Sequence, residues 1–269
     1  MLSGKIKGLD KFVIPAITGD IPHGDMPGDK VEINEDHIKK AKVIFPWLVE
    51  LLKEEVGKGK DKIVITVCGG SGVGKSEIAS ILAYYLTTAG VKTYTLSGDN
   101  YPRRIPKDND AERLRVYEEL GEEGLADYLG SDKEINFAEI EKIALDFKSG
   151  KNIISLRRLG REEGELWYDD VDFSDTNVLI IEWTHGNSDN YKGVDIPILL
   201  NSTPKETLEH RKARNRDGAT DSPFTTMVLG IEQKMIHKQA HKAKIIVSKQ
   251  GQILSFEEYS KLMESEISE

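Results

Sequence analysis

The sequence is poor in cysteine, because Cys68 is the single one among 269 residues. One thiol excludes an intrachain disulfide and a cysteine-rich zinc site, and it suits a reducing compartment. No apolar run approaches the ~20 residues that a membrane-spanning helix needs. The first residues also lack the apolar stretch of a secretory signal. We therefore expect a cytoplasmic protein that has no membrane partner.

Positive charge is also scarce, since 37 Lys and Arg stand against 46 Asp and Glu, for a formal net charge of −9. Phosphate backbones are held by Lys and Arg, so this balance argues against nucleic acid as a partner. A small phosphorylated ligand needs only a local cluster of cations. Two such clusters are present, at residues 103–104 and 211–216.

The most informative stretch is Gly-Gly-Ser-Gly-Val-Gly-Lys-Ser at residues 69–76, which fits the pattern G-x-x-x-x-G-K-[ST]. An apolar run at 62–68 leads into it and a helical pattern at 77–86 follows. Glycines let backbone N–H groups turn toward an anion, and the helix N-terminus adds partial positive charge. We predict that a nucleoside triphosphate binds here. The predicted contacts are Gly69, Gly70, Ser71, Gly72, Val73, Gly74, Lys75, Ser76 and Glu77.

Two acidic residues follow predicted strands. Asp99 comes after the strand expected at 91–96, and Glu182 lies at the end of the apolar strand expected at 176–183. Open α/β sheets place their ligands at the carboxyl ends of strands. Glu182, together with the Ser76 hydroxyl, is therefore our candidate for a Mg²⁺ site. The alternatives are an ordinary turn for Asp99 and a solvated strand end for Glu182.

A third cluster of interest is the set of arginines at 211–216. A Thr-Pro-Lys-Glu run at 203–206 combines a capping box with proline at the first helical position, which predicts a helix. Arg211, Arg214 and Arg216 lie on it or just beyond. They are either a solvated helix face or a lid that brings cations to a moving phosphoryl group.

The remaining pattern alternates strands with helices, which predicts an α/β fold with a parallel sheet of about five strands and helices on both faces. Asn34 is the expected N-cap of a helix that runs to about Val56. Residues 1–33, rich in Gly, Pro and Asp, form either a disordered arm or an ordered loop laid across the domain. No secondary structure is evident at 157–174. Further elements are expected at 110–149 (helical), 151–156 (strand), 195–200 (strand), 222–242 (helix), 244–247 (strand) and 256–267 (helix).

Four patches resemble the P-loop kinases of the uridine kinase and phosphoribulokinase family. They are residues 69–76, the Asp99-Asn100-Tyr101 run that is similar to D-x-[FY], the strand ending at Glu182 with Gly186 nearby, and residues 211–217. The resemblance spans residues 62–248 in element order. It implies ATP, with GTP left open, Mg²⁺, and phosphoryl transfer to a hydroxyl of a small polar metabolite such as a nucleoside, sugar or phosphosugar.

The resemblance also implies roles for individual residues. Asp99 would be the base for the acceptor hydroxyl, while Lys75 and the lid arginines would stabilise the transferring phosphoryl. The candidate acceptor contacts are Asp99, Tyr101, Arg104, Arg161, Tyr168 and His185. His185 could equally be a local hydrogen-bonding residue. We divide the chain into an N-terminal extension at 1–60 that packs on the core, and a kinase domain at 61–269 with its lid near 211–222.

The chain departs from the family in the acceptor region. Glu182 is followed by Trp183-Thr184-His185 rather than by glycine, and residues 157–172 do not match uridine kinase. The sequence therefore leaves the acceptor unnamed, and a homodimer stays open.

The glycine loop also leaves two other functions open. A GTP-hydrolysing switch is disfavoured because the N-K-x-D motif that reads the guanine base is missing. A bacterial P-loop protein kinase would need a protein acceptor, whereas the arginine-rich lid favours a small one.

Overall fold

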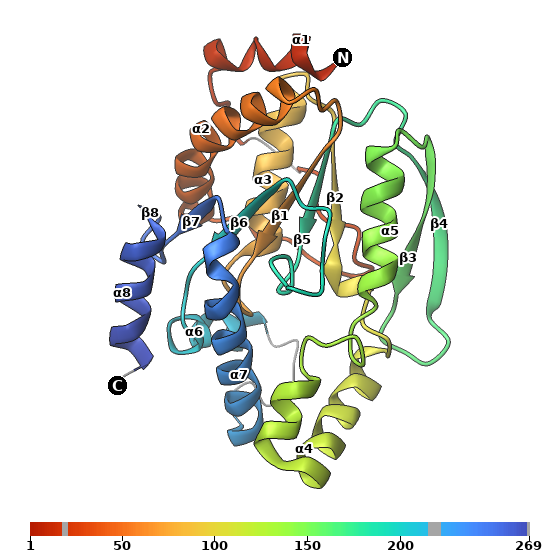
Figure 1. Cartoon of the computed structure of the whole chain (residues 1–269), viewed down its shortest axis with the longest axis vertical. Helices are drawn as coiled ribbons and strands as arrows, with labels where there is room; N and C mark the ends of the chain where they lie inside the picture. The colour runs from red at the N-terminus through yellow and green to blue at the C-terminus, as the bar shows by residue number, and fades with distance from the viewer. Residues whose placement is uncertain (18–20, 215–221, 268–269) are drawn as a thin grey trace.

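The structure, a computed structural model, describes residues 1–17, 21–214 and 222–267. Its centre is a six-stranded sheet with the order β2-β5-β1-β6-β7-β8 (Figure 1). Five of these strands are parallel: β1 (Ile63–Cys68), β2 (Thr93–Ser97), β5 (Val178–Glu182), β6 (Ile196–Leu200) and β7 (Ile245–Val247). The short β8 (Ile253–Leu254) runs antiparallel to β7. The predicted α/β fold is confirmed.

The register of the sheet brings the functional strands together. β1 lies between β5 and β6, and Val67 of β1 is opposite Glu182 of β5. On the far side of β5, Ser97 of β2 is opposite the same Glu182. Because the strands are parallel, their carboxyl ends meet at one edge of the sheet. The ends of β1, β5 and β2 therefore form a row.

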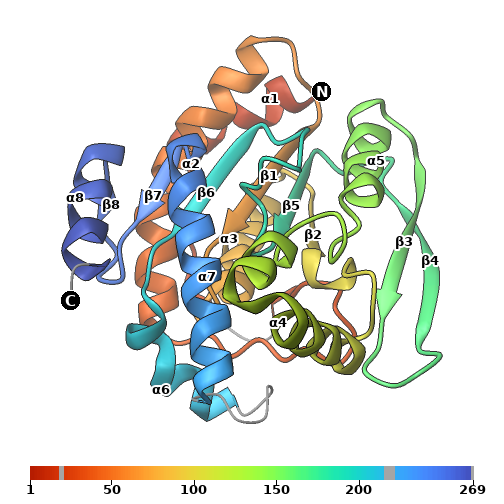
Figure 2. The ribbon, with the colours of Figure 1, turned by 60° about the horizontal axis from the view of Figure 1, so that its bottom comes forward.

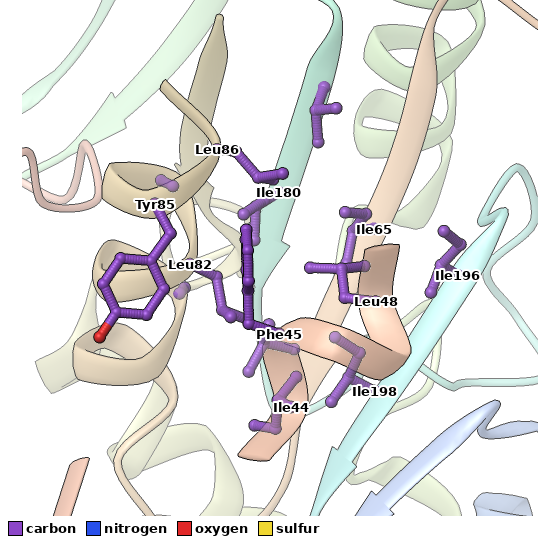
Figure 3. Packing of buried hydrophobic residues seen from close by; sticks show 14 of the residues in the cluster. Ile44, Phe45, Leu48, Ile65, Leu82, Tyr85, Leu86, Ile180, Ile196 and Ile198 are labelled. Atoms are coloured by element: carbon purple, nitrogen blue, oxygen red, sulfur yellow. The ribbon is translucent and has the colours of Figure 1, made fainter. Parts of the chain in front are cut away.

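One face of the sheet is covered by α2 (Glu35–Gly57) and α3 (Lys75–Thr88). Every second residue of the strands points to this face, as the two-residue period of a strand requires. Figure 3 shows how α2 and α3 pack their apolar side chains onto β1, β5 and β6. The residues labelled there are Ile44, Phe45 and Leu48 of α2, Leu82, Tyr85 and Leu86 of α3, and Ile65, Ile180, Ile196 and Ile198 of the strands.

The opposite face is covered by α5 (Phe137–Lys148), α7 (Pro223–Gln239) and α8 (Phe256–Ile267). Figure 1 shows α5 and α7 in front of the sheet. Val64, Leu179 and Ile181 pack in one cluster with α5, while Leu199 and Ile246 pack in another with α7 and α8. Strands that are buried on both faces read as unbroken apolar runs, which is why they were recognisable in the sequence.

Three elements surround the carboxyl edge of the sheet. They are α4 (Pro106–Tyr128), which has non-helical geometry at Gly121, α6 (Pro204–Arg214) and the start of α7. In Figure 2 they gather around that edge. The 3₁₀ turn η2 (Gly98–Asn100) follows β2 at this edge, whereas η3 (Ala240–Lys242) leads into the start of β7 at the opposite edge.

Residues 157–174 correct the sequence interpretation, because most of them belong to a β-hairpin. It consists of β3 (Ile153–Leu159) and β4 (Leu166–Asp172), paired from Ile153 opposite Asp172 to Leu159 opposite Leu166. All of β4 except the half-buried Val171 is exposed. A strand exposed on both faces has no apolar alternation, so the pattern gave no signal.

The N-terminal segment carries α1 (Leu2–Ile6) and η1 (Leu9–Lys11), whose apolar residues are buried against α2. The ring of Phe12 lies 5.8 Å from that of Phe45. Asn34 caps α2 as expected, since its side chain accepts a hydrogen bond from the backbone N–H of His37 at 3.0 Å. Within the described ranges, no helix combines the length and the apolar character needed to cross a membrane.

Candidate active site

The glycine loop at 69–76 joins β1 to α3 in a conformation that only glycine adopts easily. Gly72 and Gly74 have φ of +78° and +94°. A Cβ at Gly72 would lie 2.8 Å from Cγ of Arg211, and one at Gly74 would lie 3.0 Å from the ring of His37. The loop is therefore packed between α6 and α2, and both helices fix its shape.

The side chain of Lys75 and helix α6 both make hydrogen bonds to carbonyl groups of this loop. The Lys75 ammonium donates to the carbonyl of Gly70 at 3.1 Å, and His210 Nδ1 donates to the carbonyl of Gly72 at 2.8 Å. Arg211 is buried, and its Nη2 donates to the carbonyl of Pro204 at 3.1 Å. A small pocket opens beside the loop. It is lined by Gly70, Ser71, Ser202, Pro204, Thr207, Arg211, Leu229, Glu232 and Gln233.

Of the three arginines predicted to form a lid, the structure describes the side chain of Arg211. Arg211 lies against the loop, as its contact with Gly72 shows. Arg214 ends α6, but its side chain is outside the described part of the chain. Arg216 lies wholly outside the described residues.

Ser76 and Glu182 are brought together in the interior. The Ser76 hydroxyl donates to Glu182 Oε2 at 3.1 Å, and the Ser97 hydroxyl donates to Glu182 Oε1. Burial, and next the negative charge of Asp99, raise the pKa of Glu182 to about 8, while Lys75 opposes the rise. Oxygen donors beside excess negative charge are what Mg²⁺ prefers. Ser76 and Glu182 therefore fit this cation, with remaining positions open to water and phosphate oxygens.

Asp99 lies on η2, directly after β2, and is exposed. A Cβ at the preceding Gly98 would lie only 2.0 Å from Cγ of Trp183. The indole of Trp183 is buried under the turn and packs on the rings of Phe137 and Tyr191. This contact accounts for the departure after Glu182, because the indole supports the turn that carries Asp99.

The other predicted acceptor contacts are scattered. Tyr101 is fully buried, and His185 is buried between the rings of Phe137 and Trp183. Burial lowers the pKa of His185 to about 4, so this imidazole is neutral at pH 7. Arg104 donates to the Tyr128 hydroxyl at 3.1 Å and pairs with Glu112 at 3.5 Å. Tyr168 and Arg161 are exposed, on β4 and in the hairpin loop. The structure therefore groups Asp99 with the loop and Glu182, but does not gather all six residues.

Two features of this edge were missed in the sequence. Arg113 of α4 pairs with Glu134 at 2.6 Å and with Glu232 of α7 at 3.6 Å, which joins the two helices. Asp25, in the segment that leads to α2, accepts a hydrogen bond from the backbone N–H of Ser97 at 2.7 Å. Spacing could not reveal either feature, because both depend on segments far apart in the chain.

The fold and the glycine loop together define the class of protein: the chain has the fold of the P-loop kinases that act on small molecules. The phosphoribulokinase of Rhodobacter spheroides superposes with a TM-score of 0.52 at 22% identity, over 70% of each chain. The D-glycerate 3-kinase of Cryptococcus neoformans superposes with a TM-score of 0.54 at 13% identity, over 81% of this chain and 98% of that one. The resemblance seen in the sequence is confirmed.

Sequence comparison adds two findings. The family model described as adenylylsulphate kinase matches residues 61–117, which include β1, the glycine loop, α3 and β2. A curated relative, the bifunctional alpha-galactosidase/sucrose kinase AgaSK of Mediterraneibacter gnavus, is 48% identical over 197 residues. The match covers 73% of this chain but 21% of that protein, so this chain corresponds to about a fifth of the relative.

Proposed function

We propose that the protein is an ATP- and Mg²⁺-dependent kinase that transfers the γ-phosphoryl group to a hydroxyl of a sugar. The observation that carries the proposal is the row at the carboxyl edge: the glycine loop after β1, Glu182 at the end of β5, and Asp99 after β2. A phosphate-binding loop, a candidate metal site and a candidate base thus lie side by side, and phosphoryl transfer uses all three.

Each residue of the row has a role in this mechanism. Backbone N–H groups of residues 69–76 and the N-terminus of α3 hold the β- and γ-phosphates. Lys75 and Arg211 offset the negative charge on the oxygens of the γ-phosphoryl group during its transfer. Asp99 accepts the proton of the acceptor hydroxyl. Ser76 and Glu182 would hold Mg²⁺, which supplies charge neutralisation and orients the phosphates.

Sucrose is the first acceptor to test, because the relative that is 48% identical over 197 residues carries sucrose kinase in its name. Because this chain matches only a fifth of that relative, the relative's name does not establish the acceptor of this chain, and sucrose is our proposal. ATP is the proposed donor, and we place the reaction in the cytoplasm, where ATP is made and used.

The test is an acceptor panel with the purified full chain, Mg²⁺ and ATP or GTP. Sucrose, its two monosaccharides, glycerate, a pentose phosphate and uridine are compared by nucleoside diphosphate release, and mass spectrometry identifies the product. Lys75→Ala is the control for loop-dependent turnover, and its folding is checked by circular dichroism. Acceptor-dependent release with sucrose supports the proposal.

Three outcomes would contradict it. Hydrolysis that no acceptor stimulates would favour a regulatory NTPase. Label that enters protein rather than sugar would favour a protein kinase. Turnover that persists in folded Lys75→Ala would show that the glycine loop takes no part in the reaction.

A further inference from the structure

The segment between η1 and α2 lies against the proposed site. We call residues 21–29 the arm. Gly24 of the arm is buried, and a Cβ there would lie 3.6 Å from Glu182 Oε1 and 3.8 Å from the Ser97 Cβ. The arm therefore runs along the ends of β5 and β2, at the edge that Figure 2 brings forward.

Asp25 connects the arm to three other elements, β2, η2 and β3. Its Oδ1 accepts from the backbone N–H of Ser97 at 2.7 Å and from the Asn100 amide at 3.2 Å. Its Oδ2 accepts from the Tyr94 hydroxyl at 2.9 Å and from Arg158 Nη1 of β3 at 2.8 Å. The side chains of Asp25 and Arg158 are 10% and 8% exposed, so this ion pair is shielded from solvent.

These contacts also hold the turn that carries Asp99. Ser97 precedes the turn and Asn100 is its last residue, and both donate a hydrogen bond to Asp25. Asn100 Oδ1 accepts from the backbone N–H of Leu159 at 3.1 Å, which ties the turn to the hairpin. The arm, the Asp99 turn and the hairpin are thus one hydrogen-bonded unit.

The strand order indicates which substrate this unit faces. The pocket beside the glycine loop is lined by residues of α6 and α7, on the β6 side of β1. The arm lies on the other side, over β5 and β2. A nucleotide whose phosphates occupy the loop leaves the β5–β2 side for the acceptor, because its hydroxyl must approach in line with the γ-phosphate.

We propose that the arm is a wall of the acceptor pocket and that Asp25 is its positioning residue. The proposal rests on the proposed function, since it assigns a boundary to the acceptor site of that reaction. Asp25 does not touch the reacting atoms. It fixes the distance between the arm, the Asp99 turn and the hairpin, and so sets which acceptors fit.

The test is steady-state kinetics of Asp25→Asn, with KM measured separately for acceptor and nucleotide. Asparagine keeps the size but removes the charge that Arg158 and the Ser97 N–H recognise. Loss of charged hydrogen bonds predicts an acceptor KM raised about 10- to 100-fold, with the nucleotide KM within about twofold of wild type. Tyr94→Phe removes the hydrogen bond to Asp25 and the one that the Tyr94 hydroxyl accepts from Arg158 Nη2 at 3.2 Å. It keeps the ring, which lies 5.0 Å from that of Phe173. It should shift the acceptor KM in the same direction by less.

The matched control is Glu32→Gln, which removes one carboxylate from an exposed position near the arm. It should leave both KM values unchanged. A structural role alone would lower the fraction of folded enzyme and reduce kcat without moving the acceptor KM.

The outcomes separate the two proposals. If the wild type phosphorylates no sugar, the proposed function fails and this inference fails with it. If the wild type is active and both variants keep the wild-type acceptor KM, only the wall is disproved. A higher catalytic efficiency in Asp25→Asn would also overturn it, because the arm would then be an inhibitory cover. If Asp25→Asn does not fold, Tyr94→Phe decides between these results.

Discussion

Asp99 and Glu182 are two carboxylates at the ends of neighbouring strands, in different surroundings. Asp99 is exposed on its turn, whereas Glu182 is buried and accepts hydrogen bonds from Ser76 and Ser97. A base for the acceptor hydroxyl must be accessible to the acceptor. A metal ligand needs a fixed position beside the phosphate loop. These surroundings support our proposal that Asp99 is the base and that Glu182 holds the metal.

Substitution separates these two roles. We expect Asp99→Asn to lower phosphoryl transfer by roughly 10²- to 10⁴-fold, the usual share of general base catalysis, with little change in nucleotide affinity. Glu182→Gln should raise the Mg²⁺ concentration needed for half-maximal activity. Single-turnover transfer and a Mg²⁺ titration check both variants. The assignment is reversed if Asp99→Asn shifts the Mg²⁺ requirement while Glu182→Gln loses only the chemical step.

The contact between Gly98 and Trp183 yields a second prediction at this scale. Since a Cβ at Gly98 would lie 2.0 Å from the indole, Gly98→Ala must move the turn or the ring. Overpacking of this kind costs about 1–3 kcal/mol of unfolding free energy and should displace Asp99. Thermal unfolding and kcat should both fall. Gly57→Ala is the control, because nothing lies within 4 Å of its added Cβ.

Asp99 and Glu182 could be predicted from the sequence because both follow recognisable apolar strands. The roles of Trp183 and Asp25 could not. Trp183 packs against Gly98, and Asp25 bonds to Ser97, Tyr94 and Arg158. These partners belong to other segments, and no local period encodes them. Turn chemistry in the arm predicted a loop but not where that loop would lie.

At the scale of single elements, α6 lies on the glycine loop through His210 and Arg211. If this helix acts as a lid over the phosphates, Arg211→Ala should lower kcat more than it weakens nucleotide binding in the ground state. A cation that meets the phosphoryl in the transition state is worth several kcal/mol, so a fall in kcat of roughly 10²-fold or more is expected. Stopped-flow nucleotide binding and steady-state kcat provide the comparison.

Lys212→Ala is the matched control for the lid. Its side chain is 42% exposed and pairs with Glu209 on the same helix. Loss of this exposed pair should leave kcat within about twofold of wild type. A similar small effect for Arg211→Ala would show that α6 is not a catalytic lid.

Most helices and strands could be predicted from the sequence, because helix starts carry capping residues and buried strands are apolar. The capping box at Thr203 forms as expected, with Glu206 N donating to the Thr203 hydroxyl at 3.2 Å and Thr203 N donating to Glu206 at 2.8 Å. In the buried strand β5, apolar residues follow one another without interruption up to Glu182. The β3–β4 hairpin was missed because β4 has no buried face, and β8 because it has only two residues.

At the scale of the whole molecule, Glu55 links segments that lie far apart in the chain. Its carboxylate pairs with Lys58 at 2.7 Å, Lys60 at 2.5 Å and Lys244 at 2.9 Å. Lys60 also pairs with Asp195 at 2.6 Å, just before β6. The cluster thus connects α2 to the starts of β6 and β7. Glu55 is nearly fully buried, so its removal leaves lysines without their shared partner.

Glu55→Gln should therefore lower the free energy of unfolding by about 1–3 kcal/mol at pH 7. The three lysines lower the pKa of Glu55 from 4.5 to about 2, against the opposing effect of burial. A carboxyl whose pKa falls on folding stabilises the protein above its unfolded pKa, and this contribution disappears as pH falls through the folded value. The difference between wild type and variant should shrink between about pH 5 and pH 2. Urea unfolding at several pH values measures it, and a constant difference would contradict the assignment.

The central place of β1 also constrains how the chain can fold. Ile63 of β1 pairs with Val178, and Ile65 pairs with Ile196, so both neighbours of the strand lie far later in the sequence. During synthesis the glycine loop is made early, but its strand stays without hydrogen-bonded neighbours until residues 178–200 have left the ribosome. Such distant pairing is slow, and an unpaired apolar strand is prone to aggregate. Fragments that end before Val178 should therefore be insoluble and unable to bind nucleotide, although they contain the whole phosphate loop.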